Sequence, residues 1–131
     1  DVKIIYAKFA ALSTNGTSNI ILRVGDGATQ TTGYVTVGYN NGTGTTATSA
    51  FIICSPAVAA DAYTGTIILT LTDDDTFTWS GIMVATAQDG ASELTGAGHV
   101  NLDSALDRVI FTMANGTDIF DAGTANLIYI T

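Results

Sequence analysis

The stretch LDRVIFTMANGTDIFDAGTANLIY, residues 106–129, decides the fold of this 131-residue chain. Every second residue from Val109 to Met113 is large and apolar, which is the period of a β-strand. Asn115-Gly116 then supplies the positive φ angles of a tight reversal. Residues 124–130 return to the same two-residue period. The stretch therefore predicts a β-hairpin closed by a structured turn.

The rest of the chain repeats this pattern of short apolar runs between turn residues. It contains 22 Thr, 14 Gly and 1 Pro, a composition typical of strands and frequent bends. Eight strands are predicted, with a weaker ninth over Gly98–Leu102. They are Val2–Phe9, Asn19–Val24, Gly33–Tyr39, Ala50–Cys54, Gly65–Thr72, Thr76–Ala85, Leu106–Met113 and Thr124–Ile130. This spacing predicts an all-β fold, an antiparallel, jelly-roll-like β-sandwich, with residues 1–131 forming a single domain.

Two strands indicate where the core lies. Ile67, Leu69 and Leu71 share one face of their strand, while Thr residues occupy the other, as expected for a half-buried strand. Trp79 and Met83 share a face of the following strand and are also predicted to be core. Between strands, residues 40–49, 57–62 and 88–98 are predicted to be surface loops.

The closing stretch resembles a β-domain found at the C-terminal end of many bacteriophage tail fibres and related tail proteins. The NGTDIFDAG string from Asn115 to Gly123 is the most specific part. The run from Gly98 to Arg108 and Thr32-Gly33-Tyr34 also match. The start, VKIIYAKFAALSTNGTSNIILRVGDG, is similar to the first hairpin of that family. The resemblance implies a virion module, located on the phage tail or capsid exterior, that forms a homotrimer and contacts other virion proteins.

The same resemblance implies recognition of a host-surface glycan or protein without catalysis. Loop residues with aromatic or amide side chains are the candidate contacts, namely Tyr39, Asn40, Asn41 and Tyr63, because rings provide stacking area and amides provide hydrogen bonds. A capsid decoration or cement protein is the alternative with the same fold. A polysaccharide depolymerase domain is the alternative of a different class.

The residues offer little support for an enzyme. His99 is the only histidine and Glu93 the only glutamate. A Ser-His-Asp or Cys-His arrangement would need His99, and glycoside hydrolysis needs a pair of carboxyl groups that no spacing here indicates. Cys54 is the only cysteine and lies in an apolar run, so a buried thiol is expected. The chain is therefore predicted to be a non-enzyme without a required cofactor.

Calcium is the one metal that the carboxylates suggest. Asp73, Asp74 and Asp75 come together in one turn, and Asp118 and Asp121 flank Phe120. Oxygen ligands at such spacing suit Ca²⁺. Aspartate is also a preferred turn residue that binds nearby backbone N–H groups, and this turn role is the favoured interpretation.

Charge and hydropathy restrict the partners. Twelve acidic residues against four basic ones give a formal net charge of -8, which disfavours nucleic acid and anionic membranes. The sequence contains no run of 18 or more apolar residues, so no membrane-spanning segment is predicted. Because the chain starts at Asp1 without Met, we expect a fragment, a processed chain or the ordered part of a longer protein.

Overall fold

The computed structural model describes residues 1–56 and 58–131. Over these residues the chain forms ten strands and no helix. The strands are β1 (Ile4–Thr14), β2 (Ile20–Gly25), β3 (Val35–Asn40), β4 (Thr43–Ala47), β5 (Phe51–Cys54), β6 (Ala62–Asp73), β7 (Thr78–Ala87), β8 (Glu93–Asn101), β9 (Arg108–Met113) and β10 (Phe120–Ile130). The loop predicted over 57–62 begins at Ala57, which lies outside the described residues.

Within the described part of the chain, no helix is long and apolar enough to cross a membrane.

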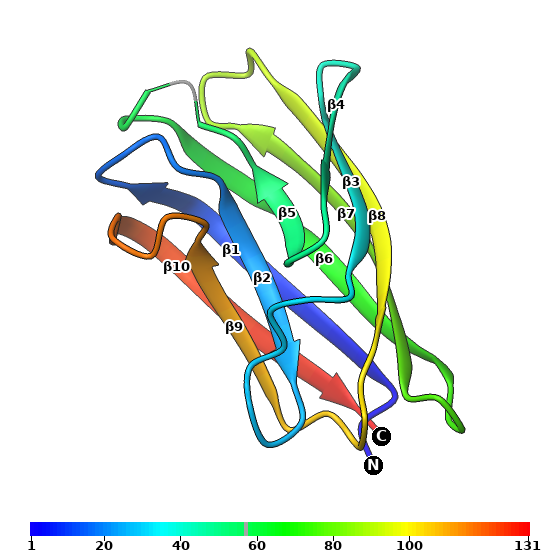
Figure 1. The fold of residues 1–131 in the computed structure, drawn as a ribbon. Helices are drawn as coiled ribbons and strands as arrows, with labels where there is room; N and C mark the ends of the chain where they lie inside the picture. Colours follow the sequence, from blue (N-terminus) through cyan, green and yellow to red (C-terminus); the bar gives the residue numbers. More distant parts are fainter. Residues whose placement is uncertain (57) are drawn as a thin grey trace.

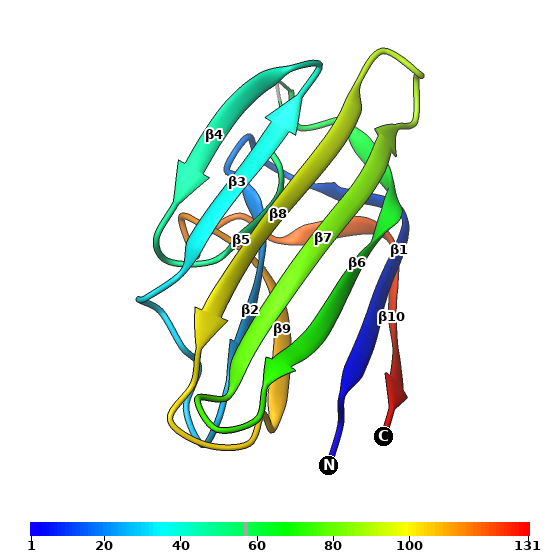
Figure 2. The same cartoon turned by 90° about the vertical axis from the view of Figure 1, so that its right-hand side faces the viewer.

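The strands form two antiparallel sheets that pack face to face (Figure 1). The larger sheet has seven strands in the order β10-β1-β6-β7-β8-β3-β4, and Figure 2 shows this order across its outer face. The smaller sheet has three strands in the order β5-β2-β9. The predicted all-β antiparallel sandwich is therefore confirmed, with ten strands instead of eight or nine.

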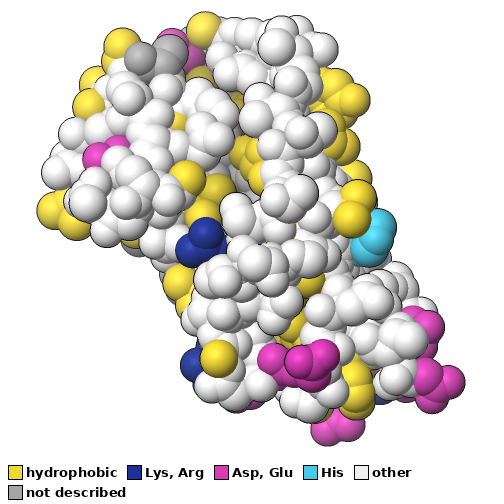
Figure 3. Space-filling model, in the orientation of Figure 1, with side chains coloured by type: hydrophobic (Ala, Val, Ile, Leu, Met, Phe, Trp, Pro, Cys, Tyr) yellow, Lys and Arg dark blue, Asp and Glu magenta, His cyan; other side chains and the backbone are white. Residues whose placement is uncertain are grey.

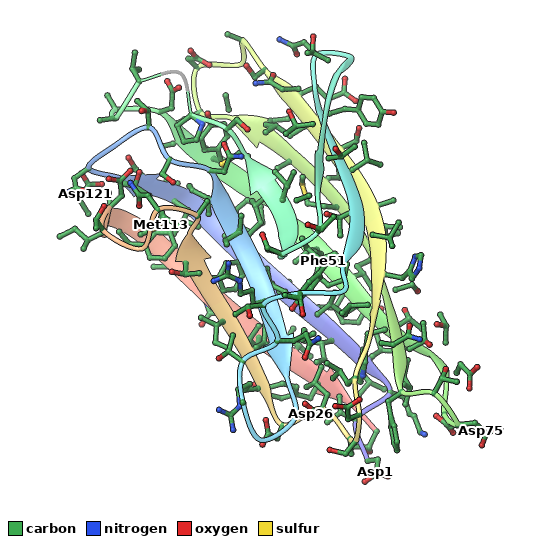
Figure 4. The ribbon with its side chains drawn as sticks, in the orientation of Figure 1. Asp1, Asp26, Phe51, Asp75, Met113 and Asp121 are labelled. Carbon is green, nitrogen blue, oxygen red and sulfur yellow. The ribbon has the colours of Figure 1, made fainter. Side chains whose placement is uncertain are left out.

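The core fills the space between the sheets. Ile67 and Leu69 of β6 and Trp79 and Met83 of β7 are buried, and Leu71 packs against them from a half-buried position. These are the faces that the two-residue alternation predicted. The small sheet contributes buried residues from β2 and β5, including Phe51, whose side chain points between the sheets in Figure 4.

The prediction of a hairpin at the C-terminal end is wrong. β9 pairs with β2 in the small sheet, whereas β10 pairs with β1 in the large sheet. The segment between them, residues 114–119, therefore crosses from one sheet to the other. The first expected hairpin is wrong for the same reason, because β1 and β2 also belong to different sheets. Each pair of strands forms an arch rather than a hairpin.

The two arches stack on each other through their loops. Asn15 N–H donates to the Ile119 carbonyl (3.1 Å), and Ile119 N–H donates to Asn15 Oδ1 (2.9 Å). Ser18 N–H donates to Asp118 Oδ2 (3.0 Å), and Asn115 N–H donates to Ser18 Oγ (2.9 Å). Each loop thus satisfies polar groups of the other, which a tight hairpin turn would not require.

The prediction that residues 40–49 are a surface loop is also wrong, because five of them form β4. β4 pairs with β3 as a hairpin, with Asn40 opposite Thr43. Asn41 and Gly42 turn the chain with φ angles of 47° and 85°, the positive values that a two-residue hairpin turn requires.

Candidate functional site

A cavity of about 440 Å³ opens between the β3–β4 hairpin and β5. Its lining combines hydroxyl, amide and apolar groups and contains no Lys, Arg, Asp, Glu or His. The lining residues are Gly38, Tyr39, Asn40, Asn41, Thr43, Thr45, Ile52, Ile53, Cys54, Ser55, Ser92 and Leu94. Three of the four predicted ligand contacts, Tyr39, Asn40 and Asn41, line this cavity.

Strand alternation explains how the cavity forms. Gly38 faces Ile52, since a Cβ added at Gly38 would lie 3.4 Å from the Ile52 side chain. In the β3–β4 ladder Thr45 lies opposite Gly38 and Thr43 lies opposite Asn40, so both threonines share the face of Gly38. The absence of a side chain at Gly38 leaves room beside β5, and the two threonines border that room.

Asn41 has a structural role at this site. Its Nδ2 donates to the Ala91 carbonyl (3.0 Å), and its Oδ1 accepts from Glu93 N–H (2.9 Å). Its own N–H donates to the Glu93 carbonyl (3.0 Å). These bonds fix the tip of the β3–β4 hairpin to the loop before β8. The amide of Asn41 is therefore engaged in holding the cavity wall.

The ring of Tyr39 lies at the edge of the site. Tyr39 follows Gly38 in β3, so its side chain points to the opposite face of the hairpin. A Cβ added at Gly44 would contact the Tyr39 ring, which places the ring over Gly44. The ring is 44% exposed. Tyr39 thus lines the cavity and presents an exposed aromatic surface at its edge.

Tyr63 lies apart from this group. It belongs to β6, is 2% exposed, and its hydroxyl donates to Asp61 Oδ2 at 3.4 Å. Burial raises the pKa of the Tyr63 phenol above its ordinary value. The structure therefore brings Tyr39, Asn40 and Asn41 together and places Tyr63 in the core. Ligand binding by any of the four stays a prediction.

Sequence reasoning missed several cavity residues, chiefly Thr43, Thr45, Ser55 and Ser92. The TGTTA sequence of β4 is rich in threonine, whose preference for strands could have indicated one. Its lack of large apolar residues made it look like a loop. Ser55 and Ser92 lie in connections whose positions only the folded chain reveals.

The thiol of Cys54 is buried, as the sequence predicted. Burial raises the pKa of this thiol to about 12, and the backbone hydrogen bond of Ile20 only partly opposes that effect. The thiol is therefore protonated at neutral pH, and a thiol is a poor nucleophile compared with a thiolate.

The candidate calcium ligands occupy turn positions. Asp73 Oδ1 accepts from Asp75 N–H (2.8 Å) and Thr76 N–H (3.2 Å), and these bonds lower the pKa of Asp73. Asp74 forms an ion pair with Lys3, with its Oδ1 2.8 Å from Nζ. These contacts are those expected of a turn-forming aspartate.

Asp118 and Asp121 lie at the opposite end of the molecule from Asp75, and Figure 4 labels Asp121 and Asp75 at the two ends. Asp118 binds the neighbouring arch loop, as described above. Over residues 1–56 and 58–131, no three side chains of His, Cys, Asp or Glu are grouped to hold a metal ion. The five aspartates thus fall into two separate groups, one at the turn between β6 and β7 and one in the loop before β10 and at the start of that strand.

The cavity wall offers neutral hydrogen-bonding groups and apolar surface, which can hold a small molecule. The titratable side chains that line the cavity are Tyr39 and Cys54, and neither is paired there with a carboxylate. His99 lies in the middle of the large sheet, opposite Ser80 of β7 and Val35 of β3.

Comparison of this chain with protein-family models, with curated proteins and with solved structures gives no match.

Proposed function

We propose that this chain is a non-enzymatic recognition domain of a bacteriophage virion and that the cavity beside β5 binds a neutral polar ligand, a sugar unit of a host-surface glycan. The virion context rests on the resemblance of the NGTDIFDAG string and the flanking sequence to tail-fibre domains. The ligand class rests on the cavity. The two parts of the proposal are independent and are tested separately.

The observation that supports the ligand class is the composition of the cavity wall. Asn40, Thr43, Thr45, Ser55 and Ser92 offer amide and hydroxyl groups, and Leu94 and Ile52 offer apolar surface. A volume of about 440 Å³ falls within the roughly 300–1,000 Å³ of ordinary small-molecule sites. Sugar hydroxyls pair with such neutral donors and acceptors, and C–H faces of the ring pack on the apolar residues.

Charge favours a neutral ligand over an anionic one. The chain carries a formal net charge of -8, and no cationic side chain lines the cavity. An anionic sugar or a phosphate would lose hydration without gaining a cationic partner. A cationic ligand would find no carboxylate in the wall. Neutral hexose-type units fit both conditions.

The test is a titration of the protein with neutral host-surface oligosaccharides, followed by NMR chemical shifts and by calorimetry. Thr45→Val keeps the shape and removes one hydroxyl, so we expect affinity to fall about two- to tenfold, the equivalent of one hydrogen bond. The matched control is Thr95→Val on β8, which does not line the cavity. Shifts that avoid β3–β5, or equal effects of both variants, would overturn the cavity assignment.

The virion role has its own readout. Binding to purified host polysaccharide without release of reducing ends supports a tail-fibre recognition domain. Release of shortened polysaccharide would support a depolymerase instead. Affinity for assembled capsids alone would support a decoration protein.

A further inference from the structure

A second cavity, of about 150 Å³, opens at the end of the sandwich where β6 turns into β7 and β1 begins. Both chain termini lie at this end in Figures 1 and 2. The lining residues are Asp1, Val2, Lys3, Leu71, Asp74, Phe77, Trp79, Ala105 and Leu106. Six of these nine residues are apolar, and none of the nine lines the cavity beside β5.

Trp79 brings a buried polar group without a partner to this cavity. The residue is 1% exposed. Among residues 1–56 and 58–131, its Nε1 is the one buried side-chain nitrogen or oxygen that lacks a hydrogen-bond partner. An indole N–H can donate a hydrogen bond but cannot accept one. Because a buried donor without a partner destabilises a fold, an acceptor atom in the cavity beside Trp79 is favoured.

Two backbone groups of the cavity wall already have hydrogen-bond partners. Leu71, which lies opposite Trp79 in the sheet, donates its N–H to the Lys3 carbonyl (2.9 Å). The Phe77 carbonyl accepts from Leu102 N–H (3.2 Å). These bonds hold the wall in place and leave the Trp79 N–H as a donor available to a ligand.

The side chains of the wall favour a mainly apolar ligand over a water molecule. A buried water usually needs about two to four polar partners. Besides Trp79, the polar side chains that line the cavity are those of Asp1, Lys3 and Asp74, and Lys3 Nζ already lies 2.8 Å from Asp74 Oδ1. A cavity of roughly 150 Å³ admits a ring of the size of benzene. A small ring with one acceptor oxygen can bond to Trp79 and pack its C–H groups on the apolar side chains.

Charge at this end favours a neutral ligand. Asp1 and Asp74 line the cavity, and Figure 3 shows acidic side chains on the surface of the end where the termini lie. These carboxylates repel an anion. A cation carries no free acceptor for the indole N–H. A neutral compound with a carbonyl oxygen meets both conditions.

We propose that this cavity binds a small neutral carbonyl compound, whose oxygen accepts a hydrogen bond from Trp79 Nε1–H and whose hydrocarbon part packs on the apolar wall. Val2 and Leu106 pack against the core from either side of this end, so the bound ring extends the core. The site is separate from the proposed glycan site and does not depend on it.

The first experiment follows the Trp79 indole by NMR. Trp79 is the only tryptophan, so the isotope-labelled chain gives a single indole N–H signal. The probe is cyclohexanone, and the control probe is methylenecyclohexane, which has the same shape but no acceptor oxygen. We expect cyclohexanone to move the indole proton downfield in a saturable way and to shift the amides of Leu71 and Leu106. Methylenecyclohexane should shift the two amides without moving the indole proton downfield.

A pair of alanine variants tests the position of the site. Ala105→Phe places a ring in the cavity from an exposed loop position, so we expect cyclohexanone binding to be lost while the chain stays folded. The matched control is Ala91→Phe, because Ala91 is exposed in the loop between β7 and β8, at the other end of the sandwich. We expect this variant to bind cyclohexanone as the wild type does.

Four outcomes would overturn the proposal. The first is an indole signal that cyclohexanone does not move, and the second is the same downfield shift with both probes, which would exclude the hydrogen bond. The third is unchanged binding by Ala105→Phe. The fourth is a long-lived water that stays at the indole N–H in the presence of cyclohexanone, which would make a structural water its only partner. None of these outcomes bears on the cavity beside β5, whose test uses oligosaccharides.

Discussion

Removing the hydroxyl of Tyr34 is expected to destabilise the crossover between the two sheets. Tyr34 is 1% exposed and precedes β3. Its hydroxyl oxygen accepts from Val24 N–H (3.0 Å), and its O–H donates to the Gln30 carbonyl (3.1 Å). These bonds tie Tyr34, just before β3 of the large sheet, to Val24 of β2 and to Gln30 in the connecting loop. Tyr34→Phe removes both bonds and keeps the ring, which packs edge-on against Phe51 at a centroid distance of 5.4 Å.

The expected loss of stability follows from the Val24 N–H donor, which Tyr34→Phe leaves without its partner. Val24 is fully buried, so its N–H would lose its partner without gaining water. An unsatisfied buried donor costs about 1–3 kcal/mol. For a chain of this size, a loss of about 2 kcal/mol lowers Tm by roughly 7 °C.

The assay is urea unfolding followed by Trp79 fluorescence, with a thermal scan as a second measure. Amide exchange at Val24 should accelerate in Tyr34→Phe relative to exchange in β7. Tyr39→Phe is the matched control, because the Tyr39 ring is exposed, and we expect a change below about 0.5 kcal/mol. Equal stability of Tyr34→Phe and the wild type would refute the reasoning, since it would mean that Val24 N–H needs no protein partner.

Three further predictions concern single sites. Cys54 should resist alkylation in the folded protein at pH 8 and react only on unfolding, because burial raises its pKa to about 12; rapid labelling of native protein, detected by mass spectrometry, would contradict this. Gly16→Ala should destabilise the stacked arches by about 1–3 kcal/mol, because its Cβ would overlap the Asp118 carboxylate. Adding Asp118→Ala should recover part of that loss in a double-mutant cycle, and strict additivity would show that the two loops are not coupled. The side chain of Arg108 lowers the pKa of Asp107, and Gly27 N–H adds to the effect. The ionised carboxylate therefore stabilises the fold above the ordinary pKa near 4, and this contribution is lost as pH falls through the lower folded-state value. Asp107→Asn should reduce the difference between urea midpoints at pH 7 and pH 2, and an unchanged difference would exclude this role.

The sequence predicted local features well because they depend on local chemistry. The alternation in β6 and β7 located Ile67, Leu69, Trp79 and Met83 in the core, and all four are buried. The apolar run around Cys54 predicted a buried thiol, which the structure confirms. A period of two residues identifies a strand and its buried face regardless of which strand lies beside it.

Strand partners were not predictable in the same way. Asn115-Gly116 is compatible with a hairpin turn, yet the loop that contains it joins two sheets. The difference lies in contacts about 100 residues apart in sequence, such as Asn15 with Ile119, and no local pattern encodes them. Such non-local pairings are the part of a β-fold that sequence periodicity leaves open.

In the candidate site, too, local sequence placed some residues correctly, whereas others come together only in the folded chain. Asn40 and Asn41 were predicted as neighbours in a loop, and they do line one cavity. The opposite wall comes from β5 and from Ser92, which only the folding of the sheets brings close. Tyr63 was predicted to lie in the loop before a strand over Gly65–Thr72, but β6 starts at Ala62, and Tyr63 is buried in the core.

The placement of β1 beside β10 has a mechanical consequence. The two strands are antiparallel, and Lys3 N–H donates to the Ile130 carbonyl at 2.8 Å. Tension applied between residues 1 and 131 would load the backbone hydrogen bonds between β1 and β10 one after another, starting from the end where the two termini lie. Two strands separate at far lower force under such loading than under shear along the strands, because only a few hydrogen bonds carry the load at any moment. A load that reaches this domain through its two ends would peel β10 away first and leave the other nine strands in place.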